Sequence, residues 1–322
     1  MLIKFVKIDT SSVKRFLKRI FFIGGIRLWV TFISLAFVGS TIVLNSEKFA
    51  QIPVDRLTIF WLLLAVFISF ISLLVNAIAW KSLLFWLGYS SNKVGLISLY
   101  LSSNLLKYLP GGIWHFVERL RVLKSHIGSG KALVSVLLEP LLMVSAALLF
   151  VPLGGWKSGT AVLCLFPAIF LAKRFREPLI RRLETLKASQ LRRISRASEM
   201  SEGPNDFLIA RDDYPFSVLI LEMLFVLLRF FGFWFCLYAF SIQSSTPFFQ
   251  WLAAFSLAWC LGLVVPGAPG GIGVFEASIL IIVGSSVPES SLIAALLCYR
   301  VVSTIVDLIA VLFVSLRRAL LV

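Results

Sequence analysis

The sequence PGGIWHF at positions 110–116 recurs as PGGIGVF at positions 269–275, with five of the seven residues identical. The two copies are 159 positions apart (269 minus 110), close to half of the 322-residue chain. A Pro-Gly-Gly sequence stops a helix, because proline lacks an amide hydrogen and glycine favours turns. The motif therefore predicts two helix breaks at equivalent places in the two halves of the chain.

The apolar segments on either side of the motif repeat with nearly the same spacing. An offset of 159 carries the start of an apolar segment at 57 onto another at 216, and an offset of 160 carries a segment starting at 132 onto 292. Seven residues alone could be a chance match or a simple turn, but the agreement of both flanking segments favours an internal repeat. We expect a unit of span, broken segment and span to occur twice.

The composition identifies these apolar segments as membrane spans. Apolar residues make up 59% of the chain and charged residues 15%, and the mean hydropathy is +0.95. A soluble domain has about 25% charged residues, so a soluble, disordered or disulfide-stapled protein is excluded. The predicted fold class is all-α, a polytopic integral membrane protein with about six full spans plus two re-entrant hairpins in an inverted repeat. The expected spans are 28–44, 57–80, 132–152, 156–172, 216–240 and 292–314.

Polar segments divide the chain into five regions. In order, these are a cytoplasmic basic amphipathic segment (1–27), a first membrane half (28–172, with the re-entrant segment 94–113), a cytoplasmic basic loop with an amphipathic helix (173–215), a second membrane half (216–316, with the re-entrant segment 250–284) and a cytoplasmic tail (317–322).

The basic residues predict the orientation of the chain. By this arrangement 26 of the 31 Lys and Arg residues lie on the cytoplasmic side, 3 lie outside and 2 lie within spans. Because an excess of Lys and Arg marks cytoplasmic loops, we expect both termini in the cytoplasm and the two repeats in opposite orientations. The net charge of +15 is therefore assigned to topology and to contact with anionic headgroups, and no nucleic-acid partner is expected.

Inverted repeats with interrupted segments at matching positions are typical of secondary transporters. Unpaired backbone cannot face lipid, so each broken segment must line a cavity or be buried in protein. The helix after a break presents free N–H groups and the positive end of its dipole, which suit a phosphate or a carboxylate. The repeat thus predicts an anion site where the two breaks meet.

Five charged residues fall within the expected spans: Glu139, Glu222, Arg229, Arg300 and Asp307. A charge at the bilayer centre costs about 2.5–3.5 kcal/mol, which makes a functional role the default expectation. The two arginines would lie at one depth on antiparallel helices, where an anion between them would relieve their repulsion. The alternative is a structural lattice in which Glu222, Arg229, Arg300 and Asp307 neutralise one another. Glu139 is expected to be protonated or paired with one of these two arginines.

No motif for nucleotide, metal or nucleophilic chemistry is found. The sequence GSGK at 128–131 lacks the first half of a phosphate-binding loop, no GxSxG elbow occurs, and the two histidines are eleven positions apart (126 minus 115). We expect no cofactor, no metal and no catalytic residue, so an intramembrane enzyme is the weakest hypothesis. The cysteines are expected to be small core side chains: Cys164, Cys236, Cys260 and Cys298.

Three segments resemble the transmembrane region of the lysylphosphatidylglycerol synthase family: Asn104–Arg119, Val265–Glu276 and Tyr299-Arg300. That region is the flippase-like part of the bacterial multiple peptide resistance factor, and it also occurs as free-standing proteins. The resemblance covers residues 25–318 and implies an inner-membrane protein that binds or translocates lipid. Full-length members carry a cytosolic aminoacyl-transferase domain, which this chain lacks, so lysyl transfer to phosphatidylglycerol is not expected.

The predicted function is to bind a lipid or lipid-linked substrate with an anionic headgroup and to move it between leaflets of the bacterial inner (plasma) membrane. The rival hypothesis is a non-transporting partner that presents lipid to a separate glycosyltransferase or lipid-modifying enzyme, with 173–215 as its docking surface. Assembly with a second copy stays open. The candidate substrate-binding residues are Lys107, Pro110, Gly111, Gly112, His115, Arg119, Glu139, Glu222, Arg229, Pro269, Gly270, Gly271, Glu276, Arg300 and Asp307.

Overall fold

The computed structural model describes residues 55–89, 94–108, 113–155, 169, 214–242, 246–264 and 273–320. Every regular element within these residues is helical. The elements are α4 (Arg56–Trp86), α5 (Leu96–Asn104), η2 (Leu105–Tyr108), α6 (Trp114–Ile127), α7 (Ser129–Leu148), η3 (Val151–Gly154), α11 (Phe216–Ala239), α12 (Phe248–Val264), α13 (Val274–Val283), η6 (Gly284–Ser286) and α14 (Glu289–Leu320).

The long apolar helices coincide with expected spans. Within the described residues, four segments are long and apolar enough to cross a membrane: Arg56–Trp86, Ser129–Gly154, Phe216–Ala239 and Ser291–Arg317. They confirm the spans expected at 57–80, 132–152, 216–240 and 292–314. The spans expected at 28–44 and 156–172 lie outside the described residues, apart from the single residue Ile169.

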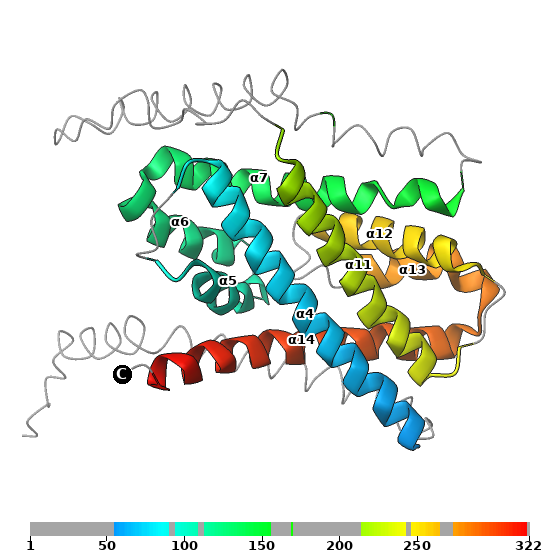
Figure 1. Ribbon diagram of the computed structural model, residues 1–322. Coiled ribbons are helices and arrows are strands. Elements are labelled where there is room, and N and C mark those ends of the chain that lie inside the picture. Colours follow the sequence, from blue (N-terminus) through cyan, green and yellow to red (C-terminus); the bar gives the residue numbers. More distant parts are fainter. Residues whose placement is uncertain are drawn as a thin grey trace, which may run out of the picture.

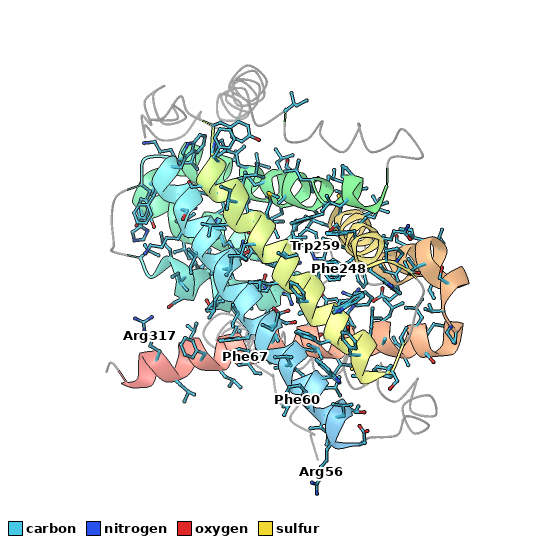
Figure 2. All side chains as sticks on the ribbon, turned by 45° about the vertical axis from the view of Figure 1, so that its right-hand side comes forward. Arg56, Phe60, Phe67, Phe248, Trp259 and Arg317 are labelled. Atoms are coloured by element: carbon cyan, nitrogen blue, oxygen red, sulfur yellow. The ribbon has the colours of Figure 1, made fainter. Side chains whose placement is uncertain are left out.

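Helix α4 shows how the sequence shapes a span. Asp55 caps it, because its carboxylate accepts hydrogen bonds from the amide and the hydroxyl of Thr58, each at 2.7 Å. These hydrogen bonds hold the pKa of Asp55 below its ordinary value. Phe60 and Phe67 point away from the other helices (Figure 2), and more than half of each side chain is exposed, at 55% and 59%. An exposed apolar face of this kind is suited to lipid.

Helices α4 and α11 form the central pair of the fold. They pack along one another and run in opposite directions (Figure 1). Gly232 allows the close approach, because a β-carbon at this position would collide with Oγ of Ser69 and would lie 3.5 Å from the Ala65 carbonyl oxygen. Small residues have this role at many transmembrane helix interfaces. The hydroxyl of Ser72 also donates to the Phe225 carbonyl at 3.2 Å.

The remaining helices surround this pair in a matched arrangement. α14 packs on α4 and α5, and α7 packs on the corresponding helices α11 and α12. Figure 1 shows α7 and α14 on opposite sides of the central pair, with α5 and α6 on one flank and α12 and α13 on the other. The order of span, short helices and span thus occurs twice, as the repeat predicts. The orientation of each half in the membrane stays a prediction.

An aromatic cluster joins α11 to α12, α13 and α14. The ring of Phe233 stacks on Phe255 with centroids 5.5 Å apart, and it meets Tyr299 edge-on at 5.5 Å. The cluster continues to Phe275 of α13, 5.7 Å from the Tyr299 ring. Figure 2 shows Phe248 and Trp259 on α12, whose rings contact Phe230 and Phe225 of α11. Tyr299 is thereby held in the core, and the following residue is Arg300.

Three of the cysteines are small core side chains, as expected. Cys236, Cys260 and Cys298 are all buried. Cys164 lies outside the described residues.

Candidate functional site

Nine of the fifteen candidate residues lie in described parts of the chain, on η2, α6, α7, α11, α13 and α14. The other six belong to the two Pro-Gly-Gly breaks and lie outside the described residues, so their role stays a prediction: Pro110, Gly111, Gly112, Pro269, Gly270 and Gly271. The nine described residues form a group of five charges, a buried pair and two separate residues, Glu222 and His115.

The first group, which we name the cationic cluster, consists of Lys107, Arg229, Glu276, Arg300 and Asp307. Asp307 of α14 is its most buried member, with a side chain 0% exposed, and Nζ of Lys107 lies 2.8 Å from its Oδ2. Nδ2 of Asn104 donates to Oδ1 at 2.8 Å, and the Tyr108 hydroxyl donates to Oδ2 at 2.7 Å. Three donors from the end of α5 and from η2 thus satisfy one carboxylate on α14, which joins the first half of the chain to the last helix.

Arg300 is held by the start of α13. Its Nε and Nη2 donate to Oε1 of Glu276 at 2.9 and 2.7 Å. Oε2 of the same carboxylate accepts the backbone N–H of Gly273 at 2.8 Å, where a φ of +81° favours glycine. The sequence predicted that this helix start would offer its N–H groups to a ligand. At Gly273 the N–H is instead occupied by Glu276.

Arg229 of α11 is the exception within the cationic cluster. Only 5% of the residue is exposed, its Nη1 has no hydrogen-bond partner, and no carboxylate of the described residues lies within ion-pair distance of it. Its guanidinium carbon lies 5.9 Å from the centre of the Phe225 ring. Arg229 and Arg300 both act electrostatically on Lys107 and on Tyr299, so the two arginines share one neighbourhood.

These contacts replace the lattice that sequence reasoning considered. Asp307 pairs with Lys107, and Arg300 pairs with Glu276. Neither of these two α14 residues pairs with a charged residue of α11 in the described part of the chain. The reason is geometric: η2 and the start of α13 bring Lys107 and Glu276 to α14, and helix periodicity alone does not reveal partners from short segments.

The second group, which we name the buried pair, consists of Arg119 and Glu139. Nη1 of Arg119 contacts both carboxylate oxygens of Glu139, at 2.7 and 2.8 Å, and the two side chains are 1% and 2% exposed. Nε donates to the Ser103 hydroxyl at 3.0 Å. The guanidinium carbon also lies 3.8 Å from the centre of the Tyr100 ring, a cation–π contact.

The buried pair gives Glu139 a partner that the sequence did not assign to it. We expected Glu139 to be protonated or paired with one of the two arginines within the spans, and its partner is instead Arg119 of α6. Arg119 points into the protein, because the opposite face of this amphipathic helix carries the exposed residues. Glu222 of α11 lies in the same neighbourhood, where Glu139 and Arg119 both act on it electrostatically.

His115 is not brought into either group by the contacts described. It lies in the first turn of α6, with its ring centroid 3.8 Å from that of Phe116. No group of three or more His, Cys, Asp or Glu residues suited to a metal occurs in the part of the chain that the structure describes.

A comparison with protein families adds an independent observation. The family described as the lysylphosphatidylglycerol synthase TM region matches residues 26–310. The chain belongs to this family. Both groups of buried charges lie inside the matched residues, and membership together with the four candidate spans makes the chain a multi-pass membrane protein. None of the curated proteins matches the chain.

Four polar residues of this lysylphosphatidylglycerol synthase TM-region protein were missed by sequence reasoning: Tyr100, Ser103, Asn104 and Tyr108. A signal for two of them exists. Lys107 and Tyr108 follow Asn104 at the helical spacings of three and four, so the three side chains share one face of a helical turn in an otherwise apolar segment. Tyr100 and Ser103 differ, because their role depends on the position of Arg119 on another helix.

Proposed function

We propose that this protein binds a lipid with an anionic headgroup at the cationic cluster and moves it between the two leaflets of the inner membrane, without catalysing a reaction. Both termini are proposed to face the cytoplasm. The headgroup phosphate would bind between Arg229 and Arg300, and Lys107 would contribute a third positive charge.

The observation that carries this proposal is that Arg229 has no carboxylate partner among the residues that the structure describes. A buried charge without a partner is costly, so its retention inside an apolar helix calls for a ligand. The cationic cluster contains three cations and two carboxylates, which leaves one positive charge when all are ionised. One phosphodiester carries one negative charge and would neutralise the cluster.

Support for movement comes from the repeat. Two matched halves place their short helices against each other's last span, as α5 lies on α14 and α12 lies on α7. In transporters built from inverted repeats, the substrate site lies between such halves, and rocking of one half against the other exposes the site to each side in turn.

The test compares Arg229→Gln and Arg229→Lys with the wild-type protein. Each purified protein is assayed for co-purified lipid by mass spectrometry. It is then reconstituted in vesicles of phosphatidylethanolamine and phosphatidylglycerol with a trace of fluorescent phosphatidylglycerol, and the probe reaching the outer leaflet is quenched by dithionite. Because hydrogen bonds to charged groups contribute about 1.5–3 kcal/mol, Arg229→Gln should lower lipid retention about tenfold or more. Arg229→Lys keeps the positive charge but loses the planar guanidinium group. Its lipid retention should lie between that of the wild-type protein and that of Arg229→Gln.

The matched control is Arg121→Gln, which removes an exposed arginine of α6. It should retain lipid as the wild-type protein does. Equal lipid retention in Arg229→Gln and the wild-type protein would overturn the binding site. Retention of lipid without movement of the probe would instead support the non-transporting lipid-presenting partner.

A further inference from the structure

Glu222 is a buried carboxylate that the proposed lipid site does not use. It lies in the second turn of the apolar helix α11, 1% exposed, and its Oε2 has no hydrogen-bond partner in the described residues. Burial of an ionised carboxylate with an unpartnered oxygen is strongly unfavourable. Something must therefore neutralise Glu222.

The charged groups around Glu222 do not supply that neutralisation. Arg119 of α6 and Glu139 of α7 are the charges that act on it, and Arg119 is already bound to both oxygens of Glu139. Tyr100 of α5 is the further titratable group in this neighbourhood. Two carboxylates against one guanidinium leave one negative charge when all three are ionised.

The other helices that pack on α11 bring no cation to Glu222. α12 contains no charged residue. On α14, Asp307 and Arg300 are bound to Lys107 and Glu276, in the cationic cluster. The buried α4 residues nearest to this level, Ser72 and Asn76, are neutral.

The register of α4 against α11 places Asn76 at the level of Glu222. Ser72 of α4 donates to the Phe225 carbonyl of α11. One helical turn further along α4 is Asn76, and one turn back along the antiparallel α11 is Glu222. Asn76 is 3% exposed and its Oδ1, an acceptor, has no donor in the described residues. A protonated Glu222 carries the donor that such an acceptor lacks.

We propose that Glu222 holds a proton, and that its exchange with water accompanies movement of the anionic lipid. The Glu222 carboxyl loses H⁺ to water and becomes a carboxylate, and it regains H⁺ from water on the other side of the membrane. One proton moving with one lipid monoanion is electroneutral. This inference rests on the proposed function for its transport role, although the proton site itself does not.

A physical connection links Glu222 to the lipid site. Adjacent residues of α5 bind the two groups of charges: Ser103 accepts from Arg119, and Asn104 donates to Asp307. When Glu222 is ionised, it competes with Glu139 for Arg119. Any movement of Arg119 changes its hydrogen bond to the Ser103 hydroxyl. The α5–η2 segment, which also carries Lys107, would transmit this shift to the cationic cluster.

The first measurement needs no lipid probe. Infrared difference spectra of the purified full-length protein detect the C=O band of a protonated carboxylic acid at neutral pH. We expect this band in the wild-type protein and in the control Glu118→Gln, which removes a partly exposed carboxylate paired with Arg121. We expect its loss in Glu222→Gln. It should also be lost in Glu139→Gln, because Glu222 then becomes the counterion of Arg119.

The second measurement uses the phosphatidylglycerol vesicles under a pH gradient. With one proton per lipid, the steady-state leaflet ratio of the probe should shift about tenfold for each pH unit, toward the alkaline side. Glu222→Gln should abolish the shift, and Glu118→Gln should keep it. If a sodium gradient drives the same shift and a pH gradient does not, the coupling ion is sodium and the proposed proton coupling is overturned.

The outcomes separate the two proposals. A carboxyl band that persists in Glu222→Gln overturns the proton site. A normal pH-driven shift in Glu222→Gln overturns the coupling. A wild-type protein that shows the band but neither retains nor moves the probe overturns the proposed lipid function and its coupling, while the proton site is supported.

Discussion

The buried pair and the cationic cluster use the same side-chain chemistry in different surroundings. Arg119 and Glu139 are 1% and 2% exposed, and they form a neutral couple. In the cationic cluster the side chains of Lys107, Arg300 and Glu276 keep 22%, 14% and 18% of their surface. That cluster also contains a cation with no carboxylate beside it in the described residues, Arg229.

We propose that this difference separates a structural role of the buried pair from a binding role of the cationic cluster. A fully buried ion pair cannot exchange its partner for a ligand without leaving a bare charge, so its removal destabilises the folded state. A partly exposed cluster with one excess positive charge can accept an anion. Burial and charge balance together, rather than the presence of charges within spans, indicate which group is a site.

The largest expected effect comes from removing one member of the buried pair. Arg119→Met leaves Glu139 without a counterion and should lower the free energy of unfolding by about 3–5 kcal/mol. Thermal unfolding in detergent, followed by size-exclusion fluorescence, measures the loss. The double variant Arg119→Met with Glu139→Met should be more stable than either single variant, since no bare charge is left. A single variant as stable as the wild-type protein would show that the buried pair is not structural.

An intermediate effect is expected at Asp307, which accepts three hydrogen bonds in the cationic cluster. Asp307→Asn keeps the shape of the side chain but removes the charge that Lys107 faces, and should cost about 1.5–3 kcal/mol of stability. It also raises the excess positive charge of the cluster, so retention of phosphatidylglycerol should increase. The readouts are thermal unfolding and lipid mass spectrometry. Weaker lipid retention in a folded Asp307→Asn variant would contradict the anion site.

The smallest effect is expected two residues along α6 from Arg119. Arg121 pairs with Glu118 at 2.8 Å, but its side chain is 68% exposed. Because surface ion pairs contribute about 0.2–1 kcal/mol and are screened by salt, Arg121→Gln should hardly change the unfolding temperature, least of all at high ionic strength. A loss as large as that of Arg119→Met would mean that exposure does not distinguish the two arginines.

The apolar pattern predicted much of the fold. Helices α4, α7, α11 and α14 coincide with expected spans, because about 20 consecutive apolar residues have few other stable locations than a bilayer. The short helices α5, α12 and α13 also fall where the interrupted apolar segments were expected. The candidate site was predicted less completely, since Glu139 and Asp307 were recognised as buried charges but their partners Arg119 and Lys107 were not assigned to them.

Local sequence determined which described segments are helical and apolar and that several charges lie on the apolar helices, because these properties depend on composition and spacing along the chain. The tertiary structure alone decided the pairing of those charges. Arg119 and Arg121 have similar sequence surroundings, yet one is buried against Glu139 and the other is exposed. Lys107 and Asp307 are 200 positions apart (307 minus 107) and meet only because α5 packs on α14. Partners so distant in sequence are selected by helix packing, and packing is a property of the whole fold.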